Sequence, residues 1–111
     1  MPSQKSDVLR GTLDLMILRT LELEPMHGYG IAQRLQQLTG GAFEVSPGSF
    51  FPALYKLERK GWIRGAWGTS GNGRRARFYT LTAAGRRQLN AELKNWDRIL
   101  LAIQKVLRAS S

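Results

Sequence analysis

Apolar side chains recur every three or four positions over residues 8–22, which is the spacing of one face of an α-helix. These residues are Leu9, Leu13, Met16, Ile17 and Leu21. The helix should end before Pro25, because a residue that precedes proline disfavours the helical region. A second amphipathic helix is predicted for residues 27–38, with Ile31, Leu35 and Leu38 on its apolar side. Gly40-Gly41 should end it, since glycine tolerates the left-handed conformation of a helix end.

A third helix is predicted for residues 47–60. Its buried side comprises Phe50, Leu54 and Leu57. Two starts are open for this helix. Ser46 would be the cap if Pro47 takes the first helical position, where a missing N–H does no harm. Ser49 would be the cap if Pro52 has to lie near the start instead.

A hairpin and a long helix follow. Residues 62–67 are aromatic and β-branched enough for a strand, residues 68–73 form a glycine-rich loop, and residues 74–81 return as a second strand. Thr82 is a plausible cap for a last helix that reaches towards Arg108. Its apolar residues follow steps of four and three, as in a coiled-coil seam: Leu89, Leu93, Trp96, Leu100, Ile103 and Leu107.

This order of elements predicts a mainly α fold with a small β-hairpin. It is the order of a winged helix-turn-helix, residues 8–81, followed by a long C-terminal helix, residues 82–110, that serves dimerisation. A chain of 111 residues buries a modest core, and a partner subunit commonly compensates for that. The polar start and the absence of a long apolar run favour a cytoplasmic protein without a membrane span.

The positive charge is concentrated in one part of the chain. Residues 47–87 contain nine cations and one acid, Glu58, so their net charge is 9 − 1 = +8. Residues 1–46 carry 4 − 5 = −1 and residues 88–111 carry 4 − 2 = +2, which completes the total of +9. Such clustering indicates a surface for a polyanion rather than a general solubility device.

This basic region supplies the donors that DNA recognition needs. A helix with one buried side and one donor-rich side can enter the major groove, and a basic ribbon can reach phosphates or the minor groove. The predicted contacts on the third helix are Ser49, Phe51, Tyr55, Lys56, Arg59 and Lys60, and those on the hairpin are Arg74, Arg75 and Arg77. A merely solvated charged face is the weaker interpretation, because the cations coincide with a recognition helix and a hairpin.

Other chemistry has little support in the sequence. The glycine-rich loop lacks the spacing of a phosphate-binding loop and does not open a helix. His27 is the only histidine and there is no cysteine, so a metal site in one chain is not expected, and a helix-start or a packing role is favoured for His27. No nucleophile and base stand at sensible spacing, which predicts a protein that is not an enzyme and has no cofactor.

Several segments resemble the PadR family of bacterial transcriptional regulators. They read LRGTLDLMILRTL, PMHGYGIAQRLQQL, SPGSFFPALYKLERKGWI and GRRARFYTLTAAGRRQL. The resemblance implies a homodimeric winged-helix repressor of the subgroup with one C-terminal helix. Its dimer would use the last helix together with the first, with Leu9, Leu13, Leu89, Leu93, Trp96, Leu100, Ile103 and Leu107 in the interface. Phe51 departs from the tyrosine usual in the family, which removes a hydroxyl near the DNA backbone.

We therefore expect two chains to present their third helices to a pseudo-palindromic DNA operator. Trp96 has two interpretations: simple packing in the seam, or one wall of a site for a small aromatic effector between the two chains. Two rival functions stay open, which are an RNA-binding winged helix and a module that binds an acidic protein.

Overall fold

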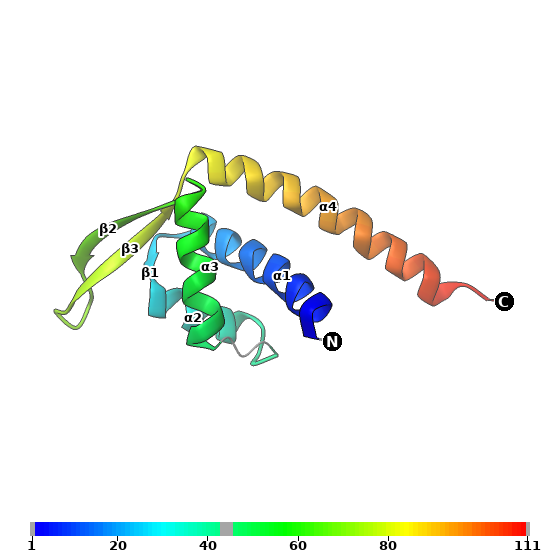
Figure 1. Ribbon diagram of the computed structural model, residues 1–111, viewed down its shortest axis with the longest axis horizontal. Coiled ribbons are helices and arrows are strands. Elements are labelled where there is room, and N and C mark those ends of the chain that lie inside the picture. The colour runs from blue at the N-terminus through cyan, green and yellow to red at the C-terminus, as the bar shows by residue number, and fades with distance from the viewer. Residues whose placement is uncertain (1, 43–45, 111) are drawn as a thin grey trace.

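The computed structural model describes the backbone of residues 2–42 and 46–110, and within the first helix the side chains from residue 12 onward. The described residues form a mainly helical fold with one three-stranded antiparallel sheet (Figure 1). In chain order the elements are α1 (Pro2–Leu23), β1 (Met26–His27), α2 (Gly28–Leu38), α3 (Pro47–Arg59), β2 (Ile63–Thr69), β3 (Arg75–Leu81) and α4 (Ala83–Arg108). The predicted winged helix-turn-helix with an added C-terminal helix is confirmed.

The sequence missed one strand and part of one helix. The two-residue strand β1 pairs with β3, Met26 opposite Tyr79 and His27 opposite Phe78, so the sheet order is β1-β3-β2. A strand this short has no periodicity to detect. Helix α1 begins at Pro2, whereas the sequence predicted a start at residue 8. The prediction began too late because the first turns of the helix are polar and carry no apolar repeat.

Helix α1 is the centre of the packing. It contacts α2, α3, α4 and β3, and the buried core is continuous across these elements. The core comprises Leu13, Ile17, Leu18, Leu21, Ile31, Leu35, Phe50, Ala53, Leu54, Leu57, Ile63, Tyr79 and Leu89. The predicted buried side of α3 is thereby confirmed, and its other side is directed away from the core.

The ends of the helices follow local chemistry. Ser46 takes the N-cap position of α3 and Pro47 follows it, so the alternative start at Ser49 is wrong, and Pro52 lies inside the helix. Thr82 caps α4 as predicted, since its Oγ1 accepts a hydrogen bond of 3.0 Å from the N–H of Gly85.

Helix α4 gives the molecule its elongated shape, with extents of 60 × 28 × 25 Å. Its first turns pack on α1, and the remainder extends past the body of the chain towards the C-terminus (Figure 1). A helix of 26 residues is roughly 39 Å long at 1.5 Å per residue. Most of its length therefore lies outside the core of this chain.

Candidate nucleic-acid interface

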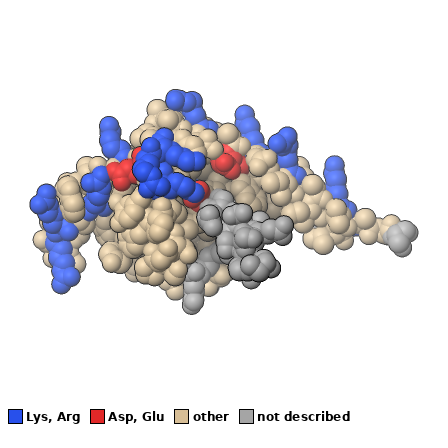
Figure 2. All heavy atoms as spheres, viewed as in Figure 1, with Lys and Arg blue, Asp and Glu red and all other residues tan. Residues whose placement is uncertain are grey.

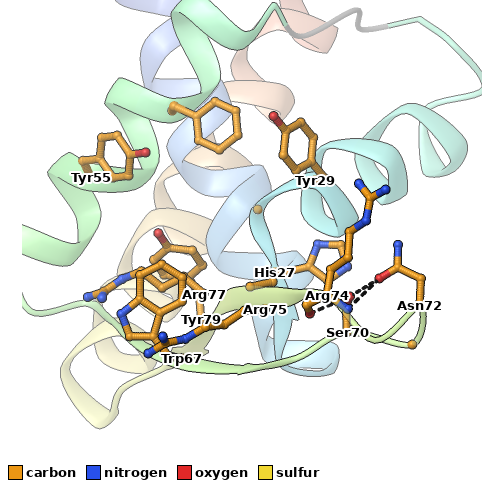
Figure 3. A pocket seen from close by; sticks show the side chains of 14 residues that line it. His27, Tyr29, Tyr55, Trp67, Ser70, Asn72, Arg74, Arg75, Arg77 and Tyr79 are labelled. Carbon is orange, nitrogen blue, oxygen red and sulfur yellow. Dashed lines mark hydrogen bonds between the residues drawn. The ribbon is translucent and has the colours of Figure 1, made fainter.

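A groove of about 820 Å³ lies between the helices and the wing, which we define as β2, β3 and the turn that joins them. One wall of the groove comes from α2 and α3, and the other comes from the wing (Figure 3). The side chains that decide its character are Tyr29, Phe51, Tyr55, Trp67, Arg74 and Arg75. The groove therefore combines aromatic surface with guanidinium groups.

The helical wall is a row of aromatic rings. Phe51 is half-buried and meets Tyr29 edge-on at 5.5 Å between ring centroids, and Tyr55 lies 6.1 Å from Phe51 on its other side. Gly28 makes room for this row, because a Cβ at position 28 would come within 2.9 Å of the Phe51 ring. Tyr29 and Tyr55 are 74% and 47% exposed, so their rings can contact a ligand in the groove.

Phe51 was predicted as a DNA contact despite its missing hydroxyl. The structure places it next to two tyrosines, Tyr29 and Tyr55, which line the same wall and carry the hydroxyl that Phe51 lacks. Sequence reasoning missed Tyr29, although an exposed aromatic residue next to two glycines at the start of a helix is a usable signal. It also missed Trp67, which is 60% exposed on β2.

The tip of the wing is a compact hydrogen-bonded turn. The N–H of Ser70 donates to the carbonyl of Arg74 at 2.8 Å, and the N–H of Gly73 donates to the carbonyl of Ser70 at 2.9 Å. The Oδ1 of Asn72 accepts from the N–H of Arg74 at 3.2 Å. Gly73 has a φ of 80°, a left-handed conformation that favours glycine. The turn is therefore ordered before any ligand binds, which lowers the entropy lost on binding.

The guanidinium groups of the wing differ in their surroundings. Arg75 stacks over the ring of Trp67 at 4.9 Å, a cation–π contact between two residues that line the groove. Arg74 is exposed at the tip. Arg77, in contrast, donates to the carboxylate of Glu58 on α3. That hydrogen bond raises the pKa of Arg77 above its ordinary value.

The predicted contacts on α3 also separate into free and engaged side chains. Lys56 donates to Asp14 of α1 at 2.6 Å, so its charge is partly neutralised within the chain. Ser49, Arg59 and Lys60 are exposed, but the Oγ of Ser49 accepts a hydrogen bond of 3.3 Å from Ser46, and Lys60 lies 4.7 Å above the ring of Trp62. Figure 2 shows lysine and arginine side chains over the wing, over the body and along α4 on this face of the molecule.

Comparison with known proteins agrees with this geometry. The family described as "Transcriptional regulator PadR-like family" matches residues 17–91. The chain belongs to the PadR-like family of transcriptional regulators. A PadR-like transcriptional regulator from Bacillus cereus shares the fold with a TM-score of 0.82 at 25% identity, over 94% of this chain and 99% of that one.

Two further relatives extend the comparison of this PadR-family chain. A PadR family transcription regulator from Clostridium difficile has a TM-score of 0.75 at 28% identity and covers 86% of this chain and 97% of its own. An uncharacterized protein X from Lysinibacillus sphaericus is 28% identical over 95 residues, which is 86% of this chain and 87% of that protein.

No helix in the described part of the chain is long and apolar enough to cross a membrane.

The residues predicted for dimerisation of this PadR-family chain fall into two groups. Leu13 and Leu89 are 7% and 0% exposed, because they pack in the chain's own core, so they offer little surface to the predicted interface. The side chain of Leu9 lies outside the described residues. Trp96 is partly exposed.

The remaining predicted residues are exposed on α4, together with others that the seam pattern did not include. We call this surface the α4 stripe, and its exposed members are Leu93, Ile99, Leu100, Ile103, Val106 and Leu107. Val106 and Leu107 are 74% and 77% exposed. Ile99 and Val106 widen the surface beyond a two-helix seam.

His27 has the helix-start role that its sequence context predicted. Its Nδ1 accepts a hydrogen bond of 3.0 Å from the N–H of Gly30 and caps α2, while its ring meets Phe78 edge-on at 5.5 Å. Among the described residues, no three side chains of the metal-binding types gather into a site.

Proposed function

We propose that this PadR-family regulator is a sequence-specific DNA-binding repressor that acts as a homodimer. The observation that carries the proposal is the convergence of the free side of α3 and the wing arginines on one groove. In this arrangement α3 enters the major groove, where Tyr55 and Arg59 contact base edges. Arg74 and Arg75 hold the flanking phosphates or enter the minor groove.

The α4 stripe supports a dimer. Soluble monomers rarely expose a large contiguous apolar surface, and a stripe this long on a projecting helix needs a partner. A second copy would cover it by two-fold symmetry, which places one α3 from each chain about 34 Å apart on one face of the duplex. A pseudo-palindromic operator matches that symmetry.

Occupation of such an operator would block transcription of the adjacent genes. A small aromatic effector would relieve the block by binding between the chains at Trp96, which is partly exposed beside the stripe. By linkage, that effector must bind the DNA-free dimer more tightly than the bound one. Such a compound should quench tryptophan emission, and Trp96→Ala should abolish the quenching. Quenching that persists in this variant would refute the proposal that the effector binds at Trp96.

Fluorescence anisotropy on a labelled duplex over a salt series tests DNA binding. Each phosphate that the protein neutralises contributes about −0.9 to the slope of log affinity against log salt. We expect a steep slope that flattens in Arg74→Ala and Arg75→Ala, which should weaken all sequences similarly. Tyr55→Ala should instead reduce the preference for the operator. A slope near zero in the unmodified protein, or tighter binding to single-stranded RNA in competition, would refute the proposal.

Sedimentation tests the dimer. Leu100→Asp places a charge in the α4 stripe and should give monomers, because an unpaired carboxylate is costly to bury. Leu101→Asp is the matched control, since Leu101 is 58% exposed on the same helical turn but lies outside the α4 stripe. If Leu100→Asp sediments as the unmodified protein does, the α4 stripe is not the interface.

A further inference from the structure

Glu58 is an anomaly on a surface that is proposed to bind a polyanion. It is the only acidic residue in residues 47–87, and it lies on α3, the helix that is proposed to enter the major groove. A carboxylate at such a place repels phosphate and lowers affinity. Its presence therefore calls for a structural reason.

The reason is its contact with the wing. Arg77 of β3 donates its Nη2 to the Oε2 of Glu58, and the two residues lie on different elements, 19 positions apart in the sequence. The side chains are 37% and 27% exposed, so the pair is partly shielded from water. A charge-assisted hydrogen bond of this kind is stronger than a neutral one.

Two neighbours fix the path of the Arg77 side chain. It crosses β2 at Gly65, where a Cβ would come within 2.9 Å of the guanidinium carbon, a distance that real Cβ atoms essentially never show. Tyr79 is buried near the pair, and burial, followed by the charge of Glu58, raises the pKa of its hydroxyl. Because Gly65 has no side chain, the side chain of Arg77 can pass over β2 and reach α3.

We propose that Glu58 and Arg77 form a clasp that fixes the angle between the wing and α3, so that both are positioning residues for DNA binding. The proposal rests on the proposed DNA-binding function. The clasp joins the last turns of α3 to the strand β3, and the exposed Arg74 and Arg75 lie beyond it towards the tip. Arg77 acts through Glu58 rather than through a phosphate.

The geometry of a lever gives the size of the effect. Asn72 at the tip is five residues from Arg77, which is about 17 Å along a strand. A rotation of roughly 10° at the clasp would displace the tip by about 3 Å. A hydrogen bond to a phosphate does not survive a displacement of that size, because its heavy atoms have to lie within about 3.2 Å.

The variant Glu58→Gln distinguishes the clasp from a direct phosphate contact of Arg77, because the two predict opposite changes in duplex affinity. It adds one net positive charge to the DNA-facing surface. If Glu58 only repelled DNA and Arg77 bound a phosphate, the duplex affinity of this variant would rise. If the clasp positions the wing, affinity should fall by about fivefold at constant salt, the lower end of the range for couplings between sites.

A second variant disturbs the contact between Glu58 and Arg77 by a steric clash, without a change in net charge. Gly65→Ala pushes the flexible Arg77 side chain off its track and leaves the net charge unchanged. It should weaken DNA binding to a similar extent, and the double variant should lose less than the sum of the two single losses, because two changes that act through one contact are not additive. Additive losses would overturn the clasp.

The salt dependence identifies the role of Arg77 independently of affinity. In an Arg74→Gln/Arg75→Gln background the wing tip has no phosphate contacts left to lose, so a further Arg77→Gln change should leave the salt slope unchanged, whereas a direct phosphate contact of Arg77 would reduce it by a further ~0.9. Circular dichroism confirms that each variant is folded. If the unmodified protein does not bind duplex, the proposed function fails. If it binds and Glu58→Gln binds equally or more tightly, only the clasp is refuted.

Discussion

Gly85 is the position where a single methyl group should do most damage to the fold. It lies in the first turn of α4, where alanine would be favoured over glycine by up to about 1 kcal/mol from helix propensity alone. A Cβ there, however, would overlap the carbonyl oxygen of Trp62 and lie 2.8 Å from both the Trp62 carbonyl carbon and the Leu81 side chain. The same carbonyl oxygen accepts a hydrogen bond of 3.1 Å from the N–H of Thr82.

The clash should win over helix propensity, because a backbone atom cannot move aside as a side-chain end can. Overpacking of this kind costs about 1–3 kcal/mol, so Gly85→Ala should lose about 1–2 kcal/mol net. For a chain of this size that is a fall of about 4–8 °C in Tm. Thermal unfolding followed by circular dichroism measures it, at one fixed protein concentration because dimerisation would contribute to Tm.

Gly48→Ala is the control for this prediction. Gly48 lies in the first turn of α3 and a Cβ there meets open space, so this variant should be as stable as the unmodified protein or slightly more stable. A Gly85→Ala protein that unfolds at or above the original temperature would refute the argument from the Trp62 carbonyl.

Two further predictions concern single side chains. Burial raises the pKa of Tyr79 above 10.0, so its contribution to stability is complete below about pH 10 and is lost as pH rises further. Tyr79→Phe should therefore show a shallower decline of the unfolding free energy above pH 10, and parallel curves would contradict this. His27→Ala removes the cap of α2 and should cost about 1 kcal/mol in urea unfolding. His27→Asn should retain most of it, and equal losses in both variants would argue against capping.

The helices and the wing were predictable because their apolar residues repeat with a clear period. The same pattern found the buried side of α3, since Phe50, Leu54 and Leu57 recur at helical spacing. It was misleading on α4, where Leu89 belongs to the same repeat as Leu93 and Leu100 but is buried in the chain's own core. A period assigns residues to one face of a helix, but it does not say which other element covers each part of that face.

The sequence predicted which region of the chain forms the candidate site. It did not predict which charged side chains in that region are free of ion pairs. Lys56 and Asp14 are 42 residues apart, and only the packing of α3 on α1 brings them together. Tyr29 was missed for a similar reason, because only the packing of α2 against α3 brings its ring next to Phe51 in the wall of the groove. Composition counts cations, whereas the tertiary contacts decide which of them a ligand can reach.

The formal charge of residues 47–87 therefore overstates the positive charge that is left for a ligand. Three of their nine cations are engaged within the chain: Lys56 with Asp14, Arg77 with Glu58 and Arg86 with Glu22. The other six form no ion pair among the described residues, and they include both arginines of the wing tip. The engaged cations join elements to one another, since each pair links two different helices or a helix and the wing. One basic region thus contains paired cations that join elements of the fold, and unpaired cations that, under the proposed function, are left to bind phosphates.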